Sequence, residues 1–262
     1  MRSIPKTSLR KSTIIIANWT IYPDPLFFYT ITMIYFAHRG ASSLAVQNTL
    51  PAFKKARELG ARCYELDVHL TADGQLAVHH DYSLKDTAGV DVEIGTLTAA
   101  ALKKISLHNR FSGEAVFVPM LEEVLPLVAP DLTLLNIELK NDDNRYPGVE
   151  NVLLKCLHNF PQLAPNILFS SFDYDTLVRL RAADKNARIG QLTRAFNVSQ
   201  ACKLQAESVH IHYARVTQEI LASCRENQLK VFCYTVNDPA QAKQLEALGV
   251  DGIFTDYIQL FN

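Results

Sequence analysis

The sequence predicts an α/β protein folded as a (β/α)8 barrel, the TIM barrel, with a small insertion after the second strand region. From residue 34 onward, short β-branched or apolar runs alternate with longer helical patterns, which is typical of a parallel sheet with right-handed crossovers. About eight such units within roughly 230 residues favour a closed barrel over an open sheet. The G-x-G-x-x-G motif of dinucleotide-binding sheets is absent from the sequence, which also argues against the open sheet.

Composition and charge agree with a globular protein. Of the 262 residues, 48% are apolar and 20% are charged, so the chain can bury a large core and is not globally disordered. Lys and Arg number 26 against 27 Asp and Glu, and this balance gives no sign of a nucleic-acid partner. We expect no transmembrane segment, because no apolar run is long enough to span a bilayer. The five cysteines include no C-x-x-C pair, which fits a reducing, cytoplasmic location.

Residues 1–33 differ from the rest and are interpreted as an N-terminal extension. A basic beginning followed by apolar residues has the outline of an export signal. However, Asn18, Pro23, Asp24 and Pro25 interrupt the apolar stretch, and no small-residue cleavage site follows. We therefore expect an irregular extension rather than an export signal, and a barrel domain over residues 34–262.

The first half of the barrel is expected to hold four strands and two helices. Pro51 in the first turn and Gly60 after the last turn delimit the first helix, and the turn TADG joins the second and third strands. The expected strands are 34–37, 63–68, 75–79 and 132–139, and the expected helices are 48–59 and 149–159. Residues 81–120 break the rhythm and are the candidate insertion over the barrel mouth.

The second half continues the alternation. The expected strands are 166–169, 188–191, 208–212, 230–235 and 252–254, and the expected helices are 174–183, 197–204, 217–227 and 239–248. A barrel of this kind presents its reactive groups at the carboxyl ends of its strands. Polar residues at those ends are therefore the first candidates for chemistry.

Three carboxylates occur in two of the strands. Glu65 and Asp67 point the same way because strand side chains alternate, and Glu138 shares its direction with Lys140 on another strand. Carboxylates brought together inside a barrel require a cation or proton uptake. Oxygen ligands alone favour Mg²⁺ or Ca²⁺ over zinc. An isolated E-x-D is usually an ordinary solvated feature, but the polar residues at successive strand ends here favour a metal site.

Two histidines and two basic residues accompany the carboxylates. His38 and His80 can transfer protons near neutral pH, and Arg39 and Lys140 can bind an anion such as phosphate. His79 competes with His80, but its side chain lies on the opposite face by alternation, so we interpret it as a packing residue. The combination indicates cleavage of a phosphodiester or phosphomonoester.

The other histidines have no carboxylates or basic residues of this kind beside them in the predicted strands, and we expect them on the surface or in the core. His212 is the foremost exception, because it ends a strand. The histidines in this group are His69, His108, His158, His210 and His212.

Seven motifs in order resemble the glycerophosphodiester phosphodiesterase family over about residues 34–260. They are AHRGASSLAVQNTLPAF, YELDVHLTADGQLAVHHDYSL, VPMLEEVL, NIELK, LFSSFD, VFCYTVND and GVDGIFTDY. The resemblance implies a barrel enzyme that uses a divalent metal to hydrolyse a small-molecule glycerophosphodiester to glycerol 3-phosphate and an alcohol. By position it also implies metal ligands at Glu65, Asp67 and Glu138, catalytic histidines at His38 and His80, and phosphate-binding residues at Arg39 and Lys140. The family's usual aromatic residue before T-V-N appears here as Tyr234.

One position departs from the family pattern. The family typically has P-E-N-T after H-R-G, whereas this chain has V-Q-N-T with Gln47 in place of the Glu. Gln47 keeps hydrogen-bonding capacity but loses a negative charge, and loss of such a supporting partner typically lowers activity about 10–100-fold. A weakened or non-catalytic phosphodiester-binding protein is therefore one alternative.

Another alternative is lipid hydrolysis of the lysophospholipase D kind. It requires an apolar slot, for which Phe111, Phe117 and Val118 in the insertion are candidates. We expect these residues to form the insertion's own small core instead.

Overall fold

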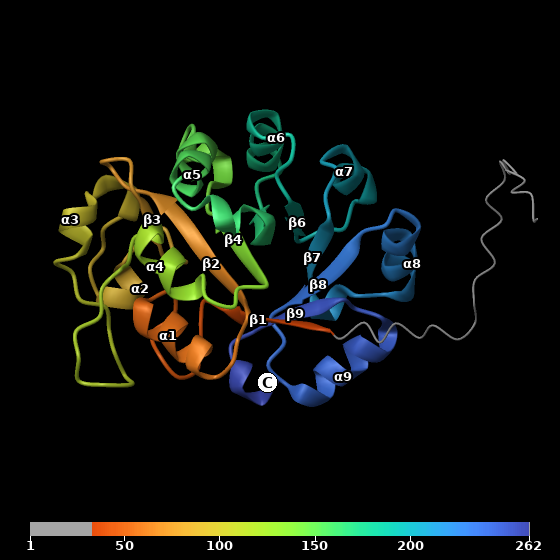
Figure 1. Ribbon diagram of the computed structural model, residues 1–262, viewed down its shortest axis with the longest axis horizontal. Coiled ribbons are helices and arrows are strands. Elements are labelled where there is room, and N and C mark those ends of the chain that lie inside the picture. Colours follow the sequence, from red (N-terminus) through yellow and green to blue (C-terminus); the bar gives the residue numbers. More distant parts are fainter. Residues whose placement is uncertain (1–32, 262) are drawn as a thin grey trace, which may run out of the picture. The chain divides into compact units, whose positions relative to one another are not determined.

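The computed structural model describes residues 33–261, which form the predicted (β/α)8 barrel (Figure 1). Strand β1 pairs with both β2 and β9, so the parallel sheet closes on itself. Around the barrel the parallel strands are β1 (Ile34–His38), β2 (Cys63–Leu70), β4 (Leu134–Leu139), β5 (Ile167–Ser171), β6 (Ile189–Thr193), β7 (Ser208–His212), β8 (Lys230–Tyr234) and β9 (Gly252–Thr255).

Strand β3 (Leu76–Val78) lies outside the closed barrel. It runs antiparallel to β2, with Val68 opposite Val78. Its apolar residues predict a strand correctly, but the five-residue connection before it is too short for the crossover that a parallel strand needs. The chain therefore turns back as a hairpin, and the next barrel strand is β4.

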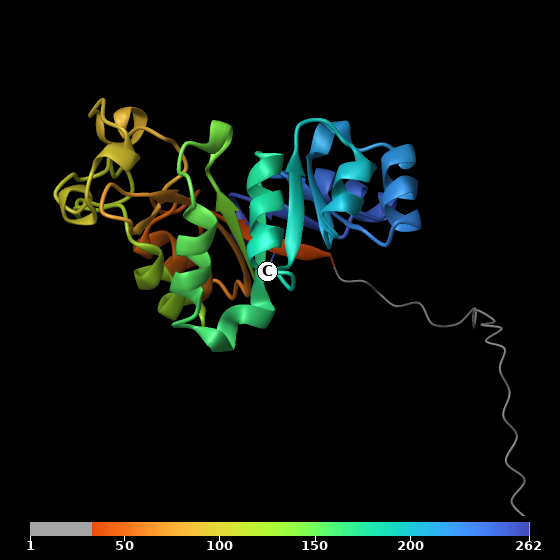
Figure 2. The same ribbon diagram turned by 90° about the horizontal axis from the view of Figure 1, so that it is seen from above.

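Helices surround the barrel, as both ribbon views show (Figures 1 and 2). They are α1 (Leu50–Glu58), α4 (Leu121–Val128), α5 (Val149–Leu157), α6 (Tyr174–Ala183), α7 (Val198–Lys203), α8 (Gln218–Glu226) and α9 (Pro239–Leu248). Side chains cap several of these helices: Asp173, for example, accepts a hydrogen bond from the backbone of Thr176 at the start of α6. Short 3-10 turns complete the connections at η2 (Asp142–Asn144), η3 (Pro161–Asn166), η4 (Tyr213–Arg215) and η5 (Ile258–Leu260).

Between β3 and α4 the chain forms a segment with only short helices. They are α2 (Lys85–Ala88), η1 (Ile94–Thr96) and α3 (Ala99–Leu102). The segment packs on a small apolar cluster of its own that includes Leu84, Ile94 and Leu102, all fully buried. It can therefore hold its shape beside the barrel mouth.

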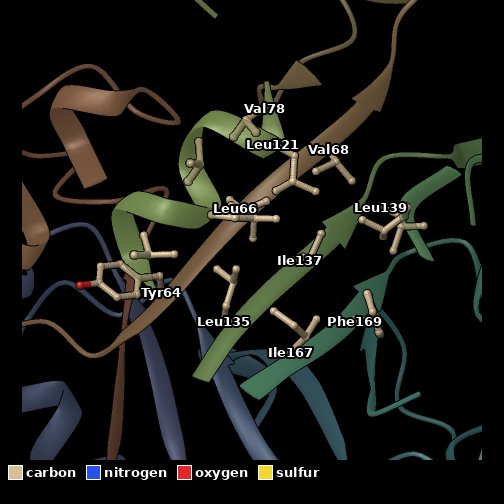
Figure 3. Close-up of a cluster of buried hydrophobic side chains, with 14 of the residues drawn as sticks. Tyr64, Leu66, Val68, Val78, Leu121, Leu135, Ile137, Leu139, Ile167 and Phe169 are labelled. Carbon is tan, nitrogen blue, oxygen red and sulfur yellow. The ribbon is translucent and has the colours of Figure 1, made fainter. Parts of the chain in front are cut away.

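The strands are buried on both faces, and this divides their residues between two roles. Leu66 and Leu139 point outward into the main core beneath the helices (Figure 3). Because neighbouring side chains alternate, Glu65, Asp67 and Glu138 point into the barrel. The same strands thus supply the outer core and the inner site.

The predicted extension at residues 1–33 lies outside the described residues except for Met33. Met33 is 3% exposed and packs in a cluster of buried apolar residues that includes Val231 and Ile253. Within residues 33–261 no helix is long and apolar enough to cross a membrane.

Candidate active site

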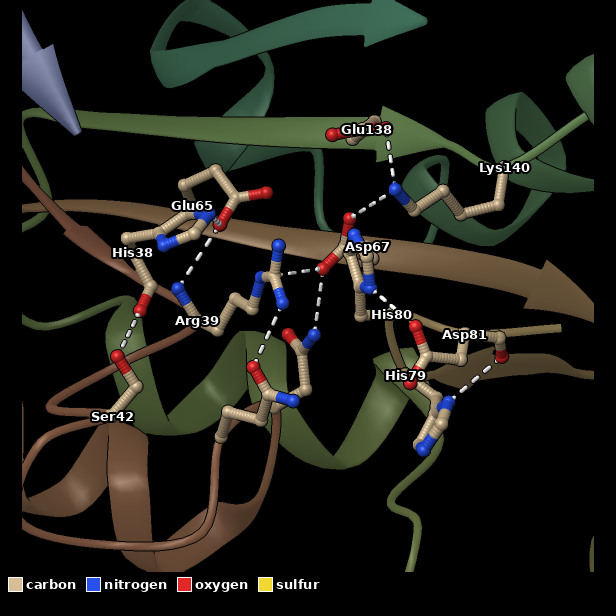
Figure 4. Close-up of polar contacts among 12 residues, drawn as sticks. His38, Arg39, Ser42, Glu65, Asp67, His79, His80, Asp81, Glu138 and Lys140 are labelled. Atoms are coloured by element: carbon tan, nitrogen blue, oxygen red, sulfur yellow. Dashed lines mark hydrogen bonds and ion pairs between the residues drawn. The ribbon is translucent and has the colours of Figure 1, made fainter. Parts of the chain in front are cut away.

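The three predicted carboxylates converge inside the barrel mouth. One oxygen from each of Glu65, Asp67 and Glu138 lies within 4.8 Å of the others (Figure 4). Their residues are only 3%, 0% and 8% exposed, respectively. Parallel pairing explains the convergence, because β2 and β4 place Asp67 directly beside Glu138. The oxygen set and its close spacing suit a hard divalent cation.

Burial and neighbouring charges shift the pKa values of the three carboxylates. Burial, together with the nearby charge of Asp67, raises the pKa of Glu65 well above its usual value. Burial also raises the pKa of Glu138 to about 7, although Lys140 opposes the shift. Burial alone would raise the pKa of Asp67, but the cations of Lys140 and Arg39 hold that pKa well below its usual range. The cluster therefore favours additional positive charge or a proton.

Lys140 and Arg39 supply part of that positive charge. Lys140 Nζ lies 2.7 Å from an oxygen of Glu138 and 3.2 Å from one of Asp67. Arg39 Nε lies 3.4 Å from the other Asp67 oxygen, whereas its Nη1 donates to Gln47 Oε1 at 2.8 Å. Burial disfavours the charge of both residues, but the surrounding carboxylates outweigh it and raise both pKa values. Both groups remain cations inside the pocket.

The loop after β1 places Arg39 by an unusual backbone path. Arg39 and Gly40 have φ angles of 58° and 82°, in the left-handed region. A Cβ atom on Gly40 would lie 2.7 Å from the carbonyl carbon of Ala52 in α1. Glycine is therefore required after Arg39 for the loop to approach α1 this closely.

His38 is held by a residue that the sequence interpretation did not select. Its Nδ1 lies 2.7 Å from Asp256 Oδ1, and Asn237 donates to the other Asp256 oxygen at 2.8 Å. This leaves Nε2 of His38 directed toward the carboxylates, 3.9 Å from Glu65 Oε2. Burial, and then the charge of Arg39, lowers the pKa of His38.

His80 has a similar arrangement, and His79 does not. His80 Nδ1 lies 2.7 Å from Asp81 Oδ1, and its ring lines the same cavity as His38. Burial lowers its pKa. His79 instead points away from the cavity and contacts the Asp81 carbonyl oxygen and the Thr87 hydroxyl. The structure therefore places His79 as a packing residue and His80 at the site.

Two adjoining cavities meet at this site. The smaller has an empty volume of about 530 Å³ and is lined by His38, Arg39, Glu65, His80, Glu138 and Lys140. Tyr234 and Phe172 form part of its wall. The wider has an empty volume of about 1390 Å³ and lies between the loop after β1, the insertion and the loops after β8 and β9. His38, Arg39 and Thr235 line both cavities.

Sequence reasoning missed Asn48, Asp81 and Asp256. Asn48 donates to Asp67 Oδ2 at 2.7 Å and has a φ of 56°. Asp81 directly follows His80, which is a local signal for a partner. Asp256 lies within the quoted run GVDGIFTDY, but only barrel closure reveals its contact with His38.

The remaining predictions on single residues have mixed outcomes. His210 is fully buried and lines the smaller cavity, whereas His212 stacks on Tyr213 and lines neither cavity at the mouth. The three residues proposed for an acyl slot do not converge. Phe111 lines the wider cavity, whereas Phe117 and Val118 line a separate surface pocket. Of the three, only Val118 belongs to the insertion's core.

A parallel barrel whose mouth holds clustered carboxylates, carboxylate-bound histidines and two buried cations has the groups that a phosphoric ester hydrolase needs. Comparison with known proteins specifies the class further. The model of the glycerophosphoryl diester phosphodiesterase family matches residues 38–260. The chain therefore belongs to this family of hydrolases.

Several curated relatives carry the name glycerophosphodiester phosphodiesterase, and two of them are among the most similar. The Bacillus altitudinis protein is 37% identical over 230 residues, which cover 85% of this chain and 94% of that protein. The Caldanaerobacter subterraneus protein is 35% identical over 229 residues, covering 84% and 92%.

Solved structures give the same result. The Thermotoga maritima glycerophosphodiester phosphodiesterase is 31% identical with a TM-score of 0.72, covering 87% of this chain and 96% of that one. An Oleispira antarctica phosphodiesterase, solved with the product sn-glycerol-3-phosphate, is 27% identical with a TM-score of 0.79, covering 87% and 94%.

Proposed function

We propose that this protein hydrolyses glycerophosphodiesters to glycerol 3-phosphate and an alcohol, with the help of a divalent cation. The observation that carries the proposal is the set of groups around one cavity: the acidic cluster, Arg39, Lys140, His38 and His80. The Oleispira antarctica relative was solved with the product sn-glycerol-3-phosphate, which supports glycerol 3-phosphate as one of the two products here.

Glu65, Asp67 and Glu138 fit a bound Mg²⁺ or Ca²⁺. Their close spacing and the raised pKa of Glu65 favour a cation among them, and among the described residues no cysteine joins the cluster. When bound, such a cation supplies charge neutralisation and holds substrate oxygens in place. Asn48 supports the set by fixing Asp67 through its amide hydrogen bond.

Arg39 and Lys140 bind the phosphoryl oxygens. Both are cations, and both border the cavity beside the carboxylates. Negative charge builds on the phosphoryl oxygens during displacement, so fixed cations next to them lower the barrier. Loss of either cation is expected to reduce turnover more than substrate affinity.

His38 and His80 move the protons. One accepts a proton from the attacking oxygen, and the other donates a proton to the departing alcohol oxygen. Each ring has a carboxylate at Nδ1, from Asp256 and Asp81 respectively. These carboxylates fix the rings and stabilise the protonated forms, while Nε2 of each ring stays available for substrate.

The test is a coupled assay for glycerol 3-phosphate on the purified full chain, with and without a chelator. The expected result is chelator-sensitive release that His38→Ala and His80→Ala abolish. The matched control is His158→Ala, because His158 lies on the outer helical layer after α5 and lines neither mouth cavity. Release that is insensitive to the chelator, or full activity of His38→Ala, would contradict the proposal.

A further inference from the structure

The two adjoining cavities divide a diester into two halves. Both meet at His38, Arg39 and Thr235, so a phosphoryl group bound by Arg39 lies at their junction. Glu65 and Glu138 line only the smaller cavity. Given the proposed function, the glycerol half belongs beside these carboxylates, and the other ester substituent extends into the wider cavity.

We propose that the wider cavity binds the leaving alcohol and that Gln47 selects alcohols rich in hydroxyl groups over alcohols that carry an ammonium group. The substrate class would be glycerophosphodiesters of polyols, such as glycerol or a cyclic polyol. This inference rests on the proposed function for the position of the phosphoryl group.

The orientation of the Gln47 amide follows from its partner. Arg39 can only donate hydrogen bonds, so the Gln47 atom 2.8 Å from Arg39 Nη1 is the carbonyl oxygen. The Gln47 amide nitrogen must then point the other way. It has no hydrogen-bond partner among the described residues, and Gln47 lines the wider cavity. Gln47 therefore offers its amide hydrogens to an acceptor on the ligand.

The rest of the wall is polar, which disfavours an acyl chain. Hydroxyl and amide side chains line the wider cavity at Ser42, Ser43, Gln47, Thr87, Thr235 and Asn237. The apolar side chains on this wall are few: Ala45, Val46 and the partly exposed aromatic rings of Phe111 and Tyr257, which are 37% and 42% exposed. A long acyl chain would bury few apolar contacts here, because the candidate apolar residues Phe117 and Val118 lie elsewhere.

The charges of the wall disfavour an ammonium group. Asp256 faces the cavity as a carboxylate, but His38, Ser42 and Asn237 already occupy its oxygens through hydrogen bonds. Arg110 lies over the Phe111 ring, 4.9 Å from its centroid, so that aromatic surface already holds a cation. Asp86 remains as a carboxylate, and it is exposed on the outer wall. The wall closest to the phosphoryl position thus presents the Arg39 cation and the amide donors of Gln47.

The test compares the hydrolysis of two diesters by the unmodified protein and by the Gln47→Glu variant. One substrate is glycerophosphoglycerol and the other is glycerophosphoethanolamine, and the readout is the ratio of their kcat/KM values. Any effect of the new charge on Arg39 cancels in this ratio, because both substrates contain the same phosphodiester. Gln244→Glu is the matched control, since Gln244 is exposed on α9 and lines neither cavity.

We expect the full chain to prefer the polyol diester and Gln47→Glu to reduce that preference about tenfold, the effect of one charge-assisted hydrogen bond. Gln244→Glu should leave the ratio unchanged. An unchanged ratio in Gln47→Glu would overturn the inference. So would cleavage of a long-acyl lysophospholipid by the unmodified protein at a higher kcat/KM than that of glycerophosphoglycerol.

Failure of the proposed function would be recognised separately. If neither diester is cleaved, the proposed hydrolysis is wrong, and the same two ligands are then compared by calorimetric titration. A tenfold loss of binding preference in Gln47→Glu would still support the leaving-alcohol site. Equal binding of both diesters by the two proteins would refute it.

Discussion

The imidazole Nδ1 of His38 lies 2.7 Å from Asp256 Oδ1, although 218 positions separate the two residues in the chain. Barrel closure makes this contact possible, because β1 and β9 are neighbours, His38 ends β1, and Asp256 directly follows β9. Asp256 fixes which nitrogen of His38 faces the cavity. The contact also lowers the pKa of Asp256 to about 2 against the opposing effect of burial, so the carboxylate stays charged at neutral pH.

Replacing Asp256 with Asn is expected to reduce kcat about 10–100-fold, as loss of a supporting carboxylate typically does. The Asn side chain cannot stabilise a protonated His38 and also permits the wrong ring tautomer. Steady-state kinetics of Asp256→Asn beside Asp175→Asn, an exposed position on α6, checks this. A kcat equal to that of the unmodified chain would show that His38 needs no carboxylate partner.

Added Mg²⁺ or Ca²⁺ is expected to stabilise the fold through the acidic cluster. At a concentration 100 times Kd, binding contributes about 2.7 kcal/mol, which raises Tm by about 5–10 °C in a domain of this size. Glu138→Gln should abolish most of the shift, because one cluster ligand loses its charge. Thermal unfolding of both proteins, with exposed Glu226→Gln as control, measures it. A full shift in Glu138→Gln would place the cation elsewhere.

The buried histidine His210 is expected to make the fold less stable in mild acid. Burial lowers its pKa to about 3, so the folded chain keeps it neutral while the unfolded chain protonates it near its usual pKa. Below that usual value the unfolded state binds more protons, and stability falls by up to about 1.4 kcal/mol per pH unit until the pH approaches the folded pKa.

His210→Gln should remove this contribution. Urea unfolding at pH 6.5, 5.5 and 4.5 compares the slope of stability against pH in the two proteins. His69, whose pKa burial also lowers to about 3, continues to contribute in both. Identical slopes would mean that His210 is not held neutral.

Gly40→Ala is expected to destabilise the fold by about 1–3 kcal/mol and to impair phosphate binding, because it strains the loop that carries Arg39. Gly60→Ala is the matched control. Gly60 has a similar φ of 86°, but its added Cβ would meet no atom within 4 Å. The difference between the two variants in chemical denaturation isolates the contact with Ala52. Equal destabilisation would show that only the backbone conformation matters.

The sequence predicted most strands and helices because buried parallel strands have a simple pattern. The run over Cys63–Leu70 places its apolar and acidic residues on alternate sides, and this fixes both the outer core and the inner carboxylates. Periodicity did not distinguish β3 from a barrel strand, since the chain direction depends on the length of the connection before it.

Site residues were predictable where a strand end carried them and not where a distant loop supplied them. Glu65, Asp67 and Glu138 follow from alternation and neighbouring strands. Asp256 contacts His38 only through closure of the sheet, and Asn48 reaches Asp67 only through a left-handed backbone turn. Gln47 attracted attention as a substitution, but its amide orientation requires the position of Arg39.

The pairing of β1 with β9 has a consequence for the timing of synthesis. A ribosome makes β1, which ends at His38, early, whereas Asp256 follows β9 and is made after all eight barrel strands. Until the final strand docks, the seam of the barrel stays open and His38 lacks its carboxylate. A nascent chain therefore carries all three carboxylates of the cluster before the carboxylate partner of His38 is in place.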